Sequence, residues 1–260
     1  QRPEMIAQIK NKTQKQRFYA ACKGKLCFDA MLPLALQLLG KSQPGRFFAG
    51  PTLALDVGGR TAWAAGHANP DELASFLNFC GCKAVILDEA VCPPPTGWTR
   101  ARTQTIFGLA AGEQLPLPAQ TEKQRALWDS LTRDEDPASG PVAEVLFPDR
   151  PARREDFYSE LCTKRSRGKA WVWALNQNGK IVCTVGAYAL GNGQAYMACG
   201  QTEEALRGQK IGGRLIVEMA NALAAAGHRP VFLCSPERVH FYTQLGFHPL
   251  GALARYENNE

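Results

Sequence analysis

The alternation of apolar and polar residues is clearest in the second half of the chain, where it predicts an antiparallel sheet. Residues 170–200 read as three strands, because turns at Asn178-Gly179 and Gly191-Asn192-Gly193 separate the apolar runs. Asparagine and glycine accept the positive φ angles of tight hairpins. Before this sheet the pattern predicts a short strand at 142–147 and a helix at 154–166. After it the pattern predicts a helix at 211–227, a buried strand at 230–235, a helix at 237–246 and a last strand at 247–257.

The first half of the chain mixes helices with strands. Its pattern predicts helices at 4–25 and 28–40, followed by a pair of strands at 52–58 and 61–66. A third helix at 70–81 and a buried strand at 83–89 come next. A strand pair, a helix and a buried strand occur in the same order at 181–234. We therefore expect the first half to be a degenerate tandem copy of the second, with an unrelated helical extension as the alternative.

Two punctuated stretches interrupt the pattern, at residues 92–97 and 133–141. The second mixes acidic residues with proline, serine and glycine, which is typical of a linker. A chain of 260 residues is long enough for two modest domains. We expect an N-terminal α/β domain over residues 1–140 and a second domain over residues 141–260.

The charge of the chain is moderate and evenly spread. Thirty basic and 24 acidic residues leave a formal net charge of +6, without the charge asymmetry of a nucleic-acid-binding tail. The opening helix carries several lysines, among them Lys12, Lys15 and Lys23, which is more typical of a solvated helix face than of a nucleic-acid footprint. We expect no nucleic-acid partner, although such binding would be recognised by its steep salt dependence.

Nine cysteines are present, an odd number without any CxxC pair. Several lie in apolar runs, so we interpret them as reduced core residues of a cytoplasmic protein. A zinc site built from Cys80, Cys82 and Cys92 would lack a fourth ligand at a usual spacing. The longest apolar stretch, at 31–39, is half a bilayer span, and we expect no signal peptide or membrane anchor.

The segment that carries chemistry is Arg207–Gly213, which joins a strand to an amphipathic helix. A glycine-rich turn at a helix start directs unpaired backbone N–H groups and the positive end of the helix dipole at one point, a geometry that binds phosphate. Glycine also opens helices for packing reasons, which is the alternative. No GxxxxGK[ST], no GxGxxG after a strand and no GxSxG occurs, which disfavours P-loop NTPases, Rossmann dehydrogenases and α/β-hydrolases.

Two motifs together give a specific resemblance. Residues 207–213 resemble the Arg/Gln-x-x-Gly-x-Gly/Ala pyrophosphate loop of the GNAT superfamily of N-acetyltransferases, and residues 239–247 resemble its later Phe-Tyr-x-x-x-Gly-Phe motif. The resemblance covers about residues 142–260. It implies an α/β fold with a mixed, mostly antiparallel sheet flanked by helices. It also implies transfer of an acetyl group from acetyl-CoA to a small-molecule or peptide amine by direct attack.

The resemblance also implies roles for individual residues. Coenzyme A would lie along the end of one strand and on the loop after it, at Cys199, Gly200, Gln201, Arg207, Gly208, Gln209, Lys210, Ile211, Gly212 and Gly213. Tyr242 would protonate the departing thiolate, unless it is only an aromatic core anchor. Lys210 replaces the first loop glycine, and would cost on the order of 1 kcal/mol if the backbone there has positive φ, while adding a cation near the phosphates.

This interpretation leaves the catalytic base and the choice between two functions open, and it makes one prediction about the first half of the chain. No catalytic base is identified, since Glu203, Glu204, Glu218 and His240 all have ordinary structural explanations. A CoA-binding sensor without turnover is the alternative function. In the first half, Asn69, Asp71 and Glu72 replace the phosphate loop, so we expect no CoA there because the carboxylates would repel a pyrophosphate.

Overall fold

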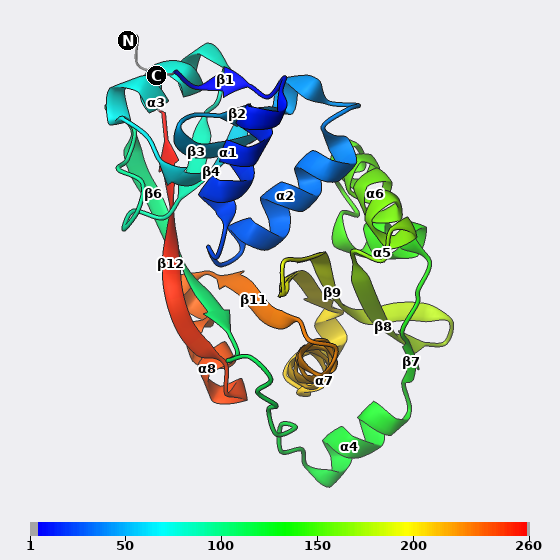
Figure 1. Cartoon of the computed structure of the whole chain (residues 1–260). Helices are drawn as coiled ribbons and strands as arrows, with labels where there is room; N and C mark the ends of the chain where they lie inside the picture. The colour runs from blue at the N-terminus through cyan, green and yellow to red at the C-terminus, as the bar shows by residue number, and fades with distance from the viewer. Residues whose placement is uncertain (1–4, 259–260) are drawn as a thin grey trace. The chain divides into compact units, whose positions relative to one another are not determined.

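The computed structural model describes residues 5–258 and divides into two compact units (Figure 1). Unit 1 comprises Gln1–Phe107, Leu233–Val239 and Pro249–Glu260, and unit 2 comprises Gly108–Phe232 and His240–His248. Two stretches near the C-terminus thus belong to the unit formed mainly by the start of the chain. The division of the sequence into domains at residue 140 stays a prediction.

The sheet of unit 2 is the one that the hairpin turns predict. Strands β7, β8, β9 and β10 are antiparallel neighbours, and β10 pairs with β11 in parallel. The two hairpin turns use left-handed asparagines, with φ 51° at both Asn178 and Asn192, each followed by a glycine of positive φ. The strand bounds are Thr132–Asp134 (β7), Trp171–Gln177 (β8), Lys180–Gly191 (β9), Gln194–Thr202 (β10) and Arg229–Cys234 (β11).

Helices cover this sheet. Val142 of α5 and Leu161 of α6 form a buried cluster with Val172 and Tyr188 of the sheet, and α5 lies beside α6 (Figure 1). Helix α7 packs on β9 and β10. The helix bounds are Glu122–Asp129 (α4), Ser139–Leu146 (α5), Pro151–Ser166 (α6), Ile211–Ala225 (α7) and Val239–Leu245 (α8), with short 3-10 turns at Glu204–Leu206 (η2) and Pro236–Arg238 (η3).

Three predicted elements need correction. Residues 142–147 were expected as a strand, but 142–146 belong to helix α5 and Phe147 caps its end. A short, mostly apolar run does not distinguish a strand from a helix, and here Val142 packs with Leu161 of α6. Residues 133 and 134 were expected in a linker but, together with Thr132, form β7, which pairs with β8. Within 4–25 the helix is confined to Lys12–Cys22 (α1), while Ala7–Gln8 is a strand (β1) and residue 4 lies outside the described residues.

Unit 1 is also a helix-flanked sheet. Its strands follow in the order β1-β2-β3-β4-β5-β12-β6, with β4 and β5 parallel. Helices α1 and α2 contact β3. The remaining bounds are Phe47–Ala49 (β2), Thr52–Gly58 (β3), Thr61–His67 (β4), Ala84–Leu87 (β5), Thr99–Gly108 (β6), His248–Glu257 (β12), Phe28–Leu39 (α2) and Pro70–Phe79 (α3), with a 3-10 turn at Pro44–Arg46 (η1).

The two units repeat one arrangement. In unit 1 the antiparallel pair β3–β4 leads through α3 to β5, which runs parallel to β4. In unit 2 the antiparallel pair β9–β10 leads through α7 to β11, which runs parallel to β10. The shared order of a strand pair, a helix and a strand that the sequence predicts is therefore found in both units, and in each the last strand is parallel to the second.

The cysteines are free thiols wherever their side chains are described. Cys22, Cys27, Cys82, Cys92, Cys183 and Cys234 are buried, and Cys80 and Cys162 are half-buried. Among residues 5–258, no group of three histidine, cysteine or acidic side chains could hold a metal ion. Over the same range, none of the helices combines the length and apolarity that a membrane crossing requires.

Candidate active site

The end of strand β10 has one unpaired side. The pairing of β10 with β11 runs from Gln194–Arg229 to Tyr196–Val231, while β10 continues to Thr202. The register of β10 against β9 shifts directly after Tyr196 and again after Ala198, so the strand changes course there. Within the described residues, the stretch 197–202 thus has a strand neighbour on its β9 side only. Such an edge can pair with an added extended chain, as expected for Cys199, Gly200 and Gln201.

The loop after β10 turns twice through left-handed backbone. Gly208 has φ 75° and Lys210, which precedes the first residue of α7, has φ 62° and ψ 13°. The backbone of Lys210 thus has the positive φ that makes a lysine costly at this position. A left-handed non-glycine residue costs on the order of 1 kcal/mol, so other contacts must hold Lys210 in place.

The start of α7 is open. No side chain caps this helix and its first turn holds no acidic residue. In the part of the chain that the structure describes, no hydrogen bond is found from the backbone amides of residues 208–213, and the first amide of the ladder is that of Arg214, which donates to the Lys210 carbonyl over 3.1 Å. Several consecutive N–H groups at the positive end of a 15-residue helix are a site for an anion.

The corresponding helix start in unit 1 is closed. Asn69 Oδ1 accepts from the amides of Asp71 and Glu72 over 2.9 and 3.2 Å, which satisfies two of the first-turn donors of α3. Glu72 in turn accepts from the amide of Ile6, and Asp71 accepts from the hydroxyl of Thr96. Two carboxylates and a side-chain cap therefore occupy the position where α7 presents free amides.

Gly212 lies against the end of β10. A Cβ added there would come within 2.7 Å of Thr202 Oγ1, closer than side-chain carbons approach. Thr202 Oγ1 also lies 3.4 Å from the sulfur of Cys183. The contact leaves room only for glycine at this position of the first turn, and the close approach sets the distance between the α7 amides and the β10 edge.

Two cations flank the loop, and both bind carbonyl groups. Arg207 Nε donates to the carbonyl of Thr202 over 3.1 Å, and Lys210 Nζ donates to the carbonyl of Ala119 over 2.7 Å. Among the described residues, neither makes an ion pair with a carboxylate. Their charge is therefore not neutralised locally, which favours an anion at the start of α7.

Tyr242 lies in an aromatic cluster on α8. Its ring centroid is 4.6 Å from that of Phe232 and 6.3 Å from that of Phe247, which is almost fully buried. Tyr242 itself is half-buried. The side chain of the neighbouring Phe241 is 40% exposed. Tyr242 thus packs as an anchor does, and its role as an acid stays a prediction.

Glu218 on α7 is held by two arginine side chains. Its carboxylate accepts from Arg214 over 3.1 Å and from Arg133 over 2.8 Å, and the side chain is largely covered. Both oxygens of the carboxylate thus accept from a guanidinium group. The geometry therefore gives no reason to assign Glu218 as a base.

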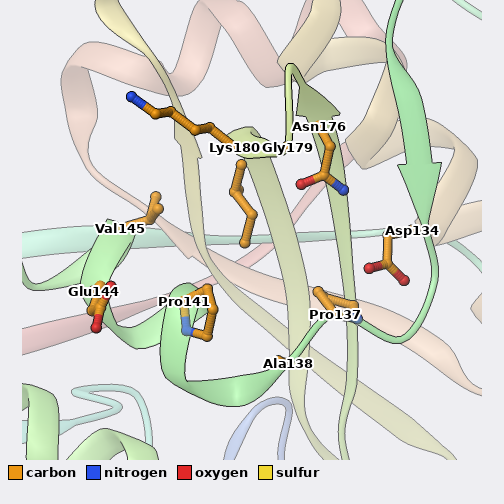
Figure 2. A pocket seen from close by; sticks show the side chains of 10 residues that line it. Asp134, Pro137, Ala138, Pro141, Glu144, Val145, Asn176, Gly179 and Lys180 are labelled. Carbon is orange, nitrogen blue, oxygen red and sulfur yellow. The ribbon is translucent and has the colours of Figure 1, made fainter.

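Unit 2 also has an open hollow of about 520 Å³ between α5 and the β8–β9 turn (Figure 2). Its polar lining consists of Asp134, Glu144, Asn176 and Lys180, and its apolar lining includes Pro137, Pro141 and Ile181. None of residues 199–213 lines it, and neither does Tyr242. This hollow is separate from the start of α7.

Comparison with known proteins agrees with this geometry. Residues 167–249 match the family model described as "Acetyltransferase (GNAT) domain". The chain carries a GNAT acetyltransferase domain. The match spans β8 to β11, the phosphate-type loop and α8. No curated protein sequence matches the chain.

Solved structures share the fold of nearly the whole chain. A GCN5-related N-acetyltransferase from Sphaerobacter thermophilus superposes with TM-score 0.64 at 14% identity, covering 98% of this chain and 95% of that one. A putative GNAT acetyltransferase from Novosphingobium aromaticivorans gives 0.54 at 18%, covering 89% and 98%. A tandem GNAT protein from the clavulanic acid biosynthesis pathway gives 0.59 at 12%, covering 98% and 97%. The predicted GNAT-type fold, a mixed and mostly antiparallel sheet flanked by helices, is confirmed.

Sequence reasoning missed several residues around the loop of the GNAT domain. Thr202, which faces Gly212, carries no motif signal because threonine is common in strands. The segment that receives Lys210 lies 91 residues earlier in the chain, so no local pattern connects the two. Helix α4 could have been found, because Thr121 and Gln124 form the capping-box spacing that begins it.

Proposed function

We propose that this protein is an acetyl-CoA-dependent N-acetyltransferase. The GNAT domain implies acetyl-CoA-dependent acetyl transfer. The finer proposal is that the group is passed by direct attack to an amine of a small molecule or a peptide, in the cytoplasm, with the second half of the chain as the catalytic domain.

The open start of α7 is the observation that carries this proposal. Free amides from Gln209 to Gly213, an uncapped helix and two cations without carboxylate partners form a site for the pyrophosphate of coenzyme A. Gly208 and Lys210 supply the left-handed turns that expose those amides. The same position in unit 1 is closed by Asn69, so we propose one CoA site per chain.

The chain's own residues would divide the work as follows. The backbone of Cys199, Gly200 and Gln201 would pair with the amide groups of the pantetheine arm along the free side of β10. Acetyl-CoA, when bound, would supply the acetyl group: the acceptor amine would attack the thioester carbonyl, an amide would form, and the thiol of coenzyme A would leave. The hydroxyl of Tyr242 would donate its proton to the departing sulfur, and we assign no residue to the deprotonation of the amine.

A coupled test separates an enzyme from a CoA-binding module without turnover. The full chain is incubated with acetyl-CoA and a panel of amines, and release of the CoA thiol is followed. Turnover with at least one amine is the expected result. Tight binding of acetyl-CoA with no turnover across amino acids, polyamines, aminoglycosides and peptides would instead favour the sensor function.

A further inference from the structure

The outer side of α7 is covered by an extended segment, residues 114–121, which we name the strap. Asn221 Oδ1 accepts from the amide of Leu115 over 2.8 Å, and Asn221 Nδ2 donates to the Leu115 carbonyl over 2.9 Å. Gln114 Nε2 also donates to the carbonyl of Asn221 over 3.0 Å. The strap is therefore fastened near the C-terminal end of the helix, and its course can be followed in green in Figure 1.

The strap continues toward the start of α7 and is fastened twice more. Arg214 donates to Gln120 Oε1 over 2.7 Å, and Lys210 donates to the Ala119 carbonyl over 2.7 Å. Positions 210, 214 and 221 are spaced as residues on one helix face are. The last of these attachments is made by Lys210, the left-handed residue of the loop at 207–213.

We propose that Lys210 is a positioning residue that ties the loop at 207–213 to the strap, and that this tie aims the α7 amides at the pyrophosphate. The inference rests on the proposed function. A glycine at position 210 would adopt positive φ without strain but could not reach the strap. A lysine accepts the strain and supplies an ammonium group that donates to a carbonyl fixed elsewhere in unit 2. The strap, rather than the loop sequence alone, then sets the loop geometry.

The position of the Lys210 ammonium distinguishes this role from direct phosphate binding. Its described partner is the Ala119 carbonyl, on the strap side of the loop. If Lys210 acts through the strap, loosening the strap at its far end must have the same effect as removing the ammonium. Asn221 offers that perturbation, because it lies ten residues after the first residue of α7 and, among the described residues, both hydrogen bonds of its side chain go to Leu115 of the strap.

Calorimetry with acetyl-CoA on the full chain tests the tie. Lys210→Met and Asn221→Ala are each expected to weaken binding about tenfold, and the double variant should be no weaker than the worse single one. Lys210→Arg should retain binding within about threefold. Lys180→Met, which removes an exposed lysine on the hairpin of the hollow, serves as the matched control with unchanged affinity. If the affinity loss of the double variant equals the product of the two single losses, Lys210 and Asn221 act independently, and the proposal is overturned in favour of a direct contact between Lys210 and phosphate.

Lys210→Gly separates positioning from mere stability. Because glycine relieves the left-handed strain, this variant should unfold at an equal or higher temperature and yet bind acetyl-CoA about tenfold more weakly. Unchanged affinity in Lys210→Gly would overturn the proposal while leaving the proposed function intact.

Hydrogen exchange tests the tie without any ligand. Amides of both 114–121 and 208–213 should exchange faster in Lys210→Met and in Asn221→Ala than in the parent protein. The tie does not exist, whatever the protein binds, if Lys210→Met leaves exchange in 114–121 unchanged and Asn221→Ala leaves exchange in 208–213 unchanged. If exchange changes as expected but the parent protein binds no acetyl-CoA, the positioning of a pyrophosphate site is refuted together with the proposed function.

Discussion

Gly212→Ala offers a sharp perturbation of the proposed CoA site. The added Cβ would lie 2.7 Å from Thr202 Oγ1, whereas close C···O contacts are about 3.3–3.6 Å. The first turn of α7 and the end of β10 must therefore move apart by about 0.6–0.9 Å. Thr202 cannot yield cheaply, since its branched side chain has a restricted χ1 and its hydroxyl lies against the buried Cys183.

The size of the effect follows from that overlap. Overpacking by one carbon costs about 1–3 kcal/mol. Because 1.4 kcal/mol corresponds to a factor of ten in affinity, we expect acetyl-CoA binding to weaken about 5- to 140-fold if the displaced helix start no longer directs its amides at the pyrophosphate. Isothermal calorimetry measures this directly, and thermal unfolding shows how much of the cost appears as lost stability.

Two variants control the experiment. Gly140→Ala makes the same change in the first turn of α5, where an added Cβ meets nothing within 4 Å, and should leave the affinity unchanged. Thr202→Ala removes the atom that the new Cβ strikes, so the Gly212→Ala/Thr202→Ala protein should bind within about threefold of Thr202→Ala alone. Full affinity in Gly212→Ala, or no rescue by Thr202→Ala, would refute the argument that this contact sets the site.

Three further predictions concern other parts of the chain. Tyr242→Phe should lower turnover about 10²- to 10³-fold at unchanged acetyl-CoA affinity, and full turnover with a slow amine would leave only the anchor role. Asn69→Ala, which uncaps α3, should lower the free energy of unfolding in urea by about 1 kcal/mol without changing CoA affinity or stoichiometry. Burial raises the pKa values of Cys82 and Cys92 to about 11, so the thiol form is favoured in the folded chain. The stability this provides should be complete below the usual thiol pKa of about 8.5 and be lost between there and pH 11; an equal pH dependence in a Cys82→Ala/Cys92→Ala variant would contradict the assignment.

The fold could be predicted where local chemistry determines it. Hairpins at Asn178-Gly179 and Asn192-Gly193 need left-handed residues, and these are visible in the sequence. Residues 142–147 were assigned wrongly because a short apolar run is compatible with both a strand and a helix, and the packing of Val142 on α6 decided between them. Strand β7 was missed because its three residues, Thr132–Asp134, are polar and gain their structure only from pairing with β8.

In the candidate site, too, features set by local sequence could be predicted and features set by tertiary contacts could not. The glycines of the loop and the following helix were evident, because phosphate-type geometry demands small residues and an amphipathic helix. The contacts that fix the loop were not, since Ala119 offers a backbone carbonyl and Thr202 offers a close packing surface. Backbone partners and packing distances depend on the tertiary structure, so the residue types at positions 119 and 202 do not predict these contacts.

The central claim is that acetyl-CoA binds through the free amides at the start of α7. It is tested most directly by titrating the ¹⁵N-labelled full chain with acetyl-CoA and following backbone amide shifts. We predict saturation at one equivalent, with the largest shifts at residues 209–213 and none at Asp71 and Glu72, the capped start of α3. Saturable binding that leaves the amides of 209–213 unmoved, or a second equivalent that shifts those of α3, would contradict the account.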